Sequence, residues 1–282
     1  MKVTPSQILV FLCLAQAANA ALTVAVDSPS TLWTSINGNF DYLSDQGTGQ
    51  PGSDIVGQGT NYGLLIAFND NGAVSHTDGD LLFRVRLDDG GTFNDVVWIG
   101  INASIDGSID AYLALNTKTN PDEIAIFLPG NDLNVSPSTT SIGAKTSLVP
   151  TSPSNYNFRP VDFNTDGGTI NDLTTDTTGD PDYYLSFMVS FQSVVNFLAA
   201  ASPSISITDQ SALRFIVATS TQVNALNQDL GGVNEEDPNY DPDLSWSELG
   251  ALSQSTSLVP EPSSALSALS SLAAFLLLRK RR

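Results

Sequence analysis

Short apolar segments separated by turn residues fill most of the chain between positions 30 and 220. They are rich in β-branched and aromatic residues, and Gly, Asp, Asn, Pro and Ser stand between them, as in all-β proteins. The predicted strands cover residues 32–36, 62–68, 81–87, 96–101, 109–115, 123–128, 156–163, 183–191 and 213–219. The pattern therefore predicts an all-β fold.

Two kinds of strand pattern predict how these strands are arranged. In 81–87, apolar residues alternate with Arg84 and Arg86, so one face of this strand belongs to the core and the other carries two cations. Segments 96–99 and 124–127 are apolar on both faces, as central strands are. These features favour an antiparallel β-sandwich with a jelly-roll-like arrangement over a single open sheet.

Residues 192–201 form the one helix-like stretch within the predicted domain, which covers residues 21–253. They join the predicted strands 183–191 and 213–219. This succession of a strand, a short amphipathic turn and a second strand resembles the late part of DOMON-like and family-nine carbohydrate-binding sandwiches. Residues 254–258 are rich in Ser and Thr and are expected to form a flexible linker.

The last residues, 259–282, fall into three parts of different chemistry. Pro260 and Pro262 lack an amide donor and hold Glu261 in extended backbone. The apolar segment 265–278 predicts a C-terminal hydrophobic helix of about 21 Å, which is short against the roughly 30 Å of hydrocarbon in a bilayer. Four consecutive cations follow and favour the cytoplasmic side of the membrane, where their long side chains can snorkel. They are Arg279, Lys280, Arg281 and Arg282.

This combination of Val-Pro-Glu-Pro-Ser, a short apolar helix and a basic end resembles a PEP-CTERM sorting signal, found in Gram-negative bacteria that make exopolysaccharide. The resemblance covers only residues 259–282. It implies that an exosortase, a transpeptidase-like membrane enzyme, recognises Pro260, Glu261 and Pro262, removes the tail and releases or attaches the rest. The inner membrane would hold the chain transiently. The alternative is an ordinary C-terminal anchor with a chance Pro-Glu-Pro, for which the span is unusually short.

Residues 1–20 have the features of a secretory signal peptide. The start is weakly basic, an apolar run follows, and the small residues Ala18 and Ala20 place the cleavage before Ala21. The one cysteine, Cys13, lies in the apolar run, so the processed chain is expected to lack disulfides and thiolate chemistry. Both termini therefore predict export to the cell envelope, the cell surface or the extracellular matrix.

The charge of the chain is strongly acidic, with a formal net charge of −19. Loss of residues 1–20 and 259–282 removes Lys2, the four tail cations and Glu261, which leaves six basic residues against 29 acidic ones and a formal charge of −23. No basic patch is available to neutralise phosphates, so nucleic acid is not an expected partner. Such a charge favours solubility and the uptake of cations.

One acidic segment has a spacing that favours Ca²⁺. Oxygen-bearing side chains alternate before a glycine, and Ca²⁺ takes six to eight oxygen ligands. The candidate ligands are Asp162, Asn164, Asp166 and Asp172. The match is partial, because Leu173 stands where such loops place their last acid. Segments 176–182 and 237–243 are further acidic clusters, and for all three the alternative is an acidic turn.

Few residues are available for catalysis. His76 is the only histidine and lies in a predicted loop, and no Gly-x-Ser-x-Gly turn supplies a nucleophile. One histidine and no retained cysteine also disfavour a zinc site. A pair of carboxylates for glycoside hydrolysis stays open, because sequence gives no distances. Trp246 is a candidate for stacking on sugar rings, whereas Trp98 is expected in the core.

The sequence thus predicts a non-enzymatic, exported protein with a structural or interaction role, processed by an exosortase. A module that binds exopolysaccharide is the alternative, and a secreted hydrolase is a third, less favoured one. Calcium is the only cofactor that the residues suggest.

Overall fold

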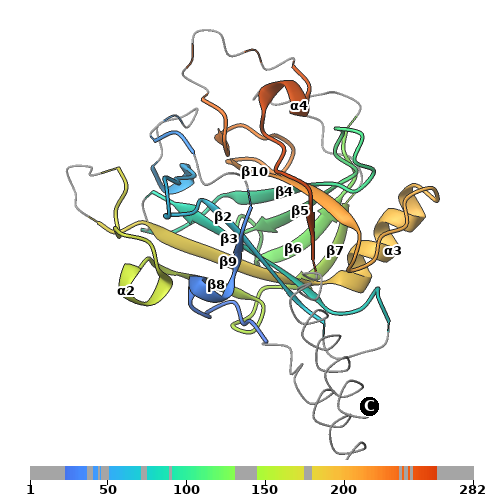
Figure 1. Ribbon diagram of the computed structural model, residues 1–282, viewed down its shortest axis with the longest axis horizontal. Helices are drawn as coiled ribbons and strands as arrows, with labels where there is room; N and C mark the ends of the chain where they lie inside the picture. Colours follow the sequence, from blue (N-terminus) through green and yellow to red (C-terminus); the bar gives the residue numbers. More distant parts are fainter. Residues whose placement is uncertain are drawn as a thin grey trace, which may run out of the picture.

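The apolar strands pair into two antiparallel sheets that face each other (Figure 1). Sheet I has the order β1 (Thr34–Ser35), β2 (Leu64–Asn69), β3 (Asp80–Leu87), β9 (Tyr183–Ser190) and β8 (Tyr156–Pro160). Sheet II has the order β11 (Asp229–Leu230), β10 (Ala212–Ser220), β4 (Val96–Asn102), β5 (Ala111–Asn116), β6 (Glu123–Phe127) and β7 (Lys145–Pro150), and β12 (Thr256–Ser257) also pairs with β10. The predicted antiparallel β-sandwich is confirmed.

This computed structural model describes residues 23–36, 41–43, 45, 51–70, 75–88, 91–130, 145–174, 180–234, 237, 241 and 244–258. Its helical elements are short: η1 (Ser30–Leu32), η2 (Pro51–Ser53), α2 (Phe163–Asp166), α3 (Phe191–Ala201) and α4 (Trp246–Leu249). Within these described ranges, no helix is long and apolar enough to cross a membrane.

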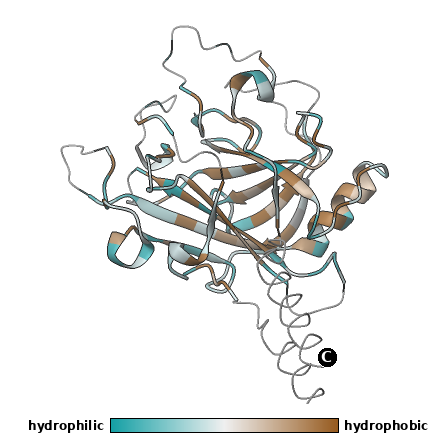
Figure 2. Ribbon diagram, viewed as in Figure 1, coloured by the Kyte–Doolittle hydropathy of each residue, from teal (hydrophilic) through white to brown (hydrophobic). Residues whose placement is uncertain are grey.

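The central core lies between the two sheets. Figure 2 shows hydrophobic residues along the central strands of both. Phe83 and Phe187 of sheet I lie 5.7 Å apart between ring centroids, and Phe83 meets Phe215 of sheet II edge to face at 5.5 Å. These rings are fully buried and join the sheets through edge and tilted contacts, which aromatic pairs prefer.

The outer faces of both sheets are covered as well. Trp98 is fully buried on the outer face of sheet II, which is covered by Leu226, Leu230, Val233, Trp246, Ala251 and Leu252. The N-terminal residues Val24, Val26 and Trp33 pack over the outer face of sheet I. The covering of sheet I buries the cationic face that the alternation in 81–87 predicted, so Arg84 and Arg86 are both inside the protein.

The predicted helix is confirmed as α3, which carries the chain from β9 in sheet I to β10 in sheet II. Its buried residues Phe191, Val194 and Leu198 lie on one face at helical spacing. Phe191 meets Phe68 edge to face at 5.4 Å, which fixes the helix on the core. Figure 1 shows α3 and α2 at opposite ends of the sandwich.

Every predicted strand segment contains an observed strand, but three short or irregular strands were missed: β7, β11 and β12. The predicted strand 156–163 ends earlier, because Asp162 caps the N-terminus of α2 by accepting from the amide of Asn164. Ser245 and Glu248 form a capping box that starts α4. The residues expected as a linker, 254–258, include β12, which pairs Ser257 with Ala212.

Candidate functional site

Carboxylates gather at the end of the sandwich where the chain passes from β3 to β4. Asp88 follows β3, Asp95 precedes β4 and Asp182 precedes β9. The backbone of Asp54 joins this end through a 3.0 Å hydrogen bond from the Asp88 amide to the Asp54 carbonyl. All four residues are buried, and buried carboxylates are usually paired with a cation or a hydrogen-bond donor.

The most buried group is the carboxylate cluster, which we define as Asp41, Asp45, Asp54 and Asp229. Their exposed fractions are only 2, 3, 0 and 1 %. One carboxylate oxygen each from Asp41, Asp45 and Asp229 lies within 4.8 Å of the other two. Asp54 is close enough to act electrostatically on both Asp41 and Asp229.

Three chain segments position the carboxylate cluster. Asp41 lies in a bridge with Gly57, to whose carbonyl its amide donates over 2.8 Å. Asp229 starts β11 and pairs with Thr219 of β10. The Thr219 hydroxyl in turn donates to the Ser53 carbonyl over 2.5 Å, which ties η2 to the edge of sheet II. The cluster therefore lies where the β1–η2 segment meets β11.

Backbone amides hold one oxygen of each key carboxylate. Asp41 Oδ1 accepts from the amides of Gly232 at 2.7 Å and Tyr42 at 3.0 Å, and Asp229 Oδ2 accepts from the amide of Ile55. The other oxygens, Asp41 Oδ2 and Asp229 Oδ1, are buried and accept no hydrogen bond in the structure. Buried polar atoms usually have a hydrogen-bond or ionic partner, so these two oxygens are candidates for binding a further group.

Burial raises the pKa of Asp41 well above its ordinary value, and the charges of Asp45 and Asp54 add to the rise. Burial likewise raises the pKa of Asp229, with further increases from Asp41, Asp54 and Asp45. Only backbone hydrogen bonds oppose these effects. As it stands, the site is strongly unfavourable for several carboxylates ionised together.

The basic side chains of the domain are used elsewhere. Five of the six between positions 21 and 258 are described, and each is held at another place. Arg84 binds Ser30, Ser186 and the Val26 carbonyl; Arg86 binds Asp182; Lys118 binds Asp95; Arg159 binds Asp166; and Arg214 binds the Ser253 carbonyl. The sixth, Lys145, has a side chain outside the described part.

A second group of acidic side chains differs from the carboxylate cluster because it includes the cationic side chain of Arg86. One oxygen each of Asp88, Asp172 and Asp182 lies within 4.8 Å of the others. Arg86 Nε donates to Asp182 Oδ2 over 2.5 Å, and both side chains are buried. Burial raises the pKa of Asp182 to about 7 although Arg86 opposes the rise. This group is an ion-pair network of the protein's own residues.

The calcium ligands predicted from sequence are divided between two places. Asp162 Oδ1 accepts from the amide and the side chain of Asn164, as a helix cap does. Both oxygens of Asp166 accept from Arg159, at 2.5 and 2.7 Å. Asp172 lies instead in the group with Asp88 and Asp182. The structure does not bring the four residues together as one ligand set, and calcium at this loop stays a prediction.

Asp166 links α2 to the N-terminal segment, and its ionisation can be tested. Burial alone would raise the pKa of Asp166, but bonds from Arg159 and from the amides of Ser30 and Asp162 outweigh it and lower the pKa to about 2. Its ionised form therefore stabilises the fold above about pH 4, and this contribution is lost as the pH falls towards 2.

In an Arg159→Gln variant, carboxyl NMR titration should give an Asp166 pKa about 1–3 pH units higher. An unchanged value would show that Arg159 does not control this carboxyl group.

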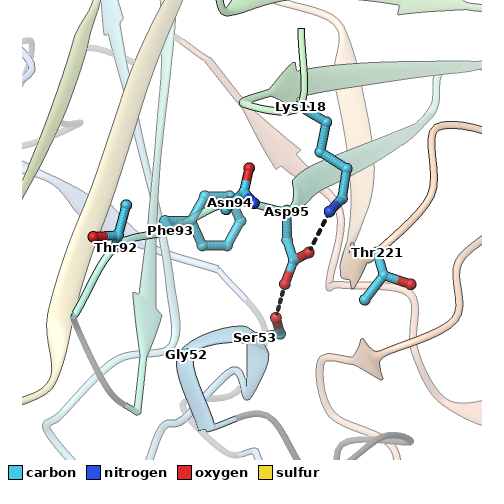
Figure 3. Close-up of a pocket in the computed structure, with 8 residues that line it drawn as sticks. All are labelled: Gly52, Ser53, Thr92, Phe93, Asn94, Asp95, Lys118 and Thr221. Carbon is cyan, nitrogen blue, oxygen red and sulfur yellow. Dashed lines mark hydrogen bonds and ion pairs between the residues drawn. The ribbon is translucent and has the colours of Figure 1, made fainter.

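A polar pocket opens at the same end of the sandwich (Figure 3). Asp95 lies between Lys118 and Ser53 in this view: its carboxylate pairs with the Lys118 ammonium at 3.1 Å and accepts from the Ser53 hydroxyl. The charged groups therefore neutralise each other. The rest of the lining is small or polar apart from Phe93.

The single histidine and the tryptophans occupy structural positions. His76 is exposed, and its Nδ1 lies 3.0 Å from Asp209 Oδ1. No Ser or Thr hydroxyl contacts its ring in the described part of the chain. Trp33, Trp98 and Trp246 are all buried, so the expectation that Trp246 stacks on sugars from the surface was wrong. Its ring packs over sheet II with Leu226, Leu230 and Leu252.

The residues of the carboxylate cluster were missed by sequence reasoning because they share no local spacing.

Several predicted site residues lie outside the described part of the chain. They are the signal-cleavage residues Ala18, Ala20 and Ala21, the motif Pro260, Glu261 and Pro262, and the cations 279–282. So does Asp176, together with most of segment 237–243.

No protein-family model, no curated protein and no solved structure matches the chain.

Proposed function

We propose that this protein is an exported, exosortase-processed component of the cell surface or extracellular matrix, with a structural or interaction role and no catalytic activity. One observation carries the proposal: the sequence has a signal-peptide pattern that ends at Ala20 and a tail that joins Pro260-Glu261-Pro262 to an apolar segment and four cations. Within the described residues, Val24 is the first buried one and β12 ends at Ser257, so the described sandwich lies between the two expected cuts. Removal of both ends would take away none of its described strands.

The proposal includes a jelly-roll-like arrangement of the two sheets. Sheet I pairs β3 with β9 and sheet II pairs β4 with β10, while β3 leads into β4 and β9 leads through α3 into β10. Two neighbouring connections thus cross between the sheets, which supports a jelly-roll-like arrangement. The apolar segment 265–278 would form the transient membrane helix.

An interaction role is favoured over polysaccharide binding. Stacking on sugars needs exposed aromatic rings. The three tryptophans are in the interior, and among the described residues only Tyr42 and Phe163 are exposed aromatic side chains. The formal charge of −23 after processing favours the solubility of such a domain and suits a basic or cationic partner.

Processing can be tested by expressing the full chain in hosts with and without an exosortase. We expect the mature mass to lack the last two dozen residues only in the host with the enzyme. A Glu261→Ala variant should keep its tail in both hosts and stay in the membrane fraction, because the recognised carboxylate is gone.

Gln254→Ala is the matched control, since Gln254 is exposed, near the cut and outside the motif. It should be processed like the wild type. Equal masses of the wild type in the two hosts would contradict the sorting proposal.

A further inference from the structure

We propose that the carboxylate cluster is a Ca²⁺ site, with Asp41, Asp45 and Asp229 as side-chain ligands and Asp54 as an additional negative charge beside them. Nothing in this inference requires export or processing, because the full-length chain contains the same residues. It is also a different place from the loop of Asp162 and Asp166, whose second carboxylate already binds Arg159.

The carboxylate cluster contains two buried oxygens that accept no hydrogen bond. Asp41 and Asp229 are at least 98 % buried, and each turns one oxygen to backbone amides. Asp41 Oδ2 and Asp229 Oδ1 are left without a donor. A buried carboxylate oxygen without a donor is costly, and a cation would compensate for both at once.

The distances between the carboxylate oxygens also suit a single Ca²⁺ ion. Ca²⁺ binds oxygen at about 2.3–2.6 Å, so two ligand oxygens on one ion lie at most about 5 Å apart. An oxygen of Asp41, one of Asp45 and one of Asp229 are all within 4.8 Å of one another. A single ion can therefore reach all three carboxylates without moving the backbone segments that hold them.

The chemistry of the ligands selects the metal. The group contains only carboxylates, without histidine or cysteine, and oxygen ligands suit hard cations rather than zinc or copper. Mg²⁺ usually keeps several waters and uses one or two carboxylates, whereas Ca²⁺ accepts a larger set of protein oxygens. Three almost fully buried carboxylates favour Ca²⁺.

A bound ion would join parts of the chain that are far apart in sequence. Asp41 and Asp45 lie between β1 and η2, and Asp229 lies in β11 at the edge of sheet II. The ion would fasten the β1–η2 segment to that edge. Since the ion would bind the folded state alone, it should raise thermal stability.

The test uses the full-length chain, purified in mild detergent, stripped with chelator and titrated with CaCl₂ by calorimetry and by thermal unfolding. We expect one Ca²⁺ per chain and, at Ca²⁺ about 100-fold above its Kd, a rise in Tm of about 5–10 °C. MgCl₂ should give a clearly smaller rise. No binding at 10-fold the roughly 1 mM Kd of weak extracellular sites would overturn the proposal.

Asp229→Asn is the decisive variant, because its amide oxygen can still accept from Ile55 while one negative charge is removed. It should lose the Ca²⁺-dependent rise in Tm, and in chelator it should be at least as stable as the wild type because repulsion is relieved. Asp41→Asn is a second variant with the same expectation, should Asp229→Asn not fold.

Asp162→Asn is the matched control, since asparagine caps a helix as well as aspartate. It should keep the full calcium response. If Asp162→Asn abolishes the response and Asp229→Asn leaves it intact, calcium binds at the α2 loop and the inference is wrong.

Discussion

An Arg86→Met variant is expected to lose about 3–5 kcal/mol of the free energy of unfolding, the usual cost of removing one partner of a buried ion pair. Arg86 is 1 % exposed, and its Nε donates to the fully buried Asp182 over 2.5 Å. Its Nη2 also donates to the Ile170 carbonyl over 3.0 Å. Methionine fills similar space but removes the guanidinium from both acceptors, and Asp182 keeps only the longer 3.3 Å bond from the Leu173 amide.

The loss of unfolding free energy in Arg86→Met should increase as the pH rises. Burial already raises the pKa of Asp182 to about 7 with Arg86 present, and without Arg86 it should rise further. The folded variant then keeps a proton that the unfolded chain releases near pH 4. Stability is therefore highest at low pH and is lost as the pH rises through the folded pKa. Urea unfolding at pH 5 and pH 8 should show the larger loss at pH 8.

A double variant separates the charge from the packing. Asp182→Asn added to Arg86→Met removes the uncompensated carboxylate and should recover much of the loss. Arg214→Met is a matched control, because Arg214 donates to the Ser253 carbonyl rather than to a carboxylate. It should cost clearly less. If the coupling energy of Arg86 and Asp182 is under about 0.5 kcal/mol, the pair is independent and this reading of the site fails.

The strands were predictable because their signal is local. The alternation in 81–87 has the two-residue period of a strand, and the apolar run 96–99 is short and made of β-branched and aromatic residues; both signals lie in neighbouring positions. The burial of Arg84 was not predictable, since Trp33 covers it from a segment about fifty positions earlier, with the guanidinium carbon 4.2 Å from the ring centroid. A charged strand face ordinarily indicates solvent.

The same distinction applies to the candidate sites. Asp162 to Asp166 has a spacing that resembles a calcium loop, but this spacing also suits a capped helical turn, and Arg159 takes the second carboxylate. Asp41 and Asp229 have no spacing that links them, because their approach depends on the pairing of β10 with β11 and on the bridge between Asp41 and Gly57. Only long-range pairing brings them together.

A Trp98→Ala variant is expected to lose about 3–5 kcal/mol, because it empties the second core on the outer face of sheet II. Trp98 is fully buried, and its ring meets Phe127 edge to face at 5.0 Å between centroids. Its partners on the two neighbouring strands are Ala114 and Ala218. These small side chains cannot fill the space that the indole leaves, so the cavity should persist and the cost should be high. Thermal unfolding should show a Tm lower by about 6–20 °C.

Trp98→Phe is the control that keeps most of the ring volume. It loses the 2.7 Å hydrogen bond from Nε1 to Ser220 Oγ, but the Ser220 hydroxyl still donates to the Gln222 carbonyl over 2.6 Å. The loss should therefore be about 1–2 kcal/mol, made up of one hydrogen bond and a smaller cavity. If Trp98→Ala costs no more than Trp98→Phe, the side chains around Leu226, Leu230 and Trp246 do not form a packed layer over sheet II. In that case the sandwich would depend on the central core alone.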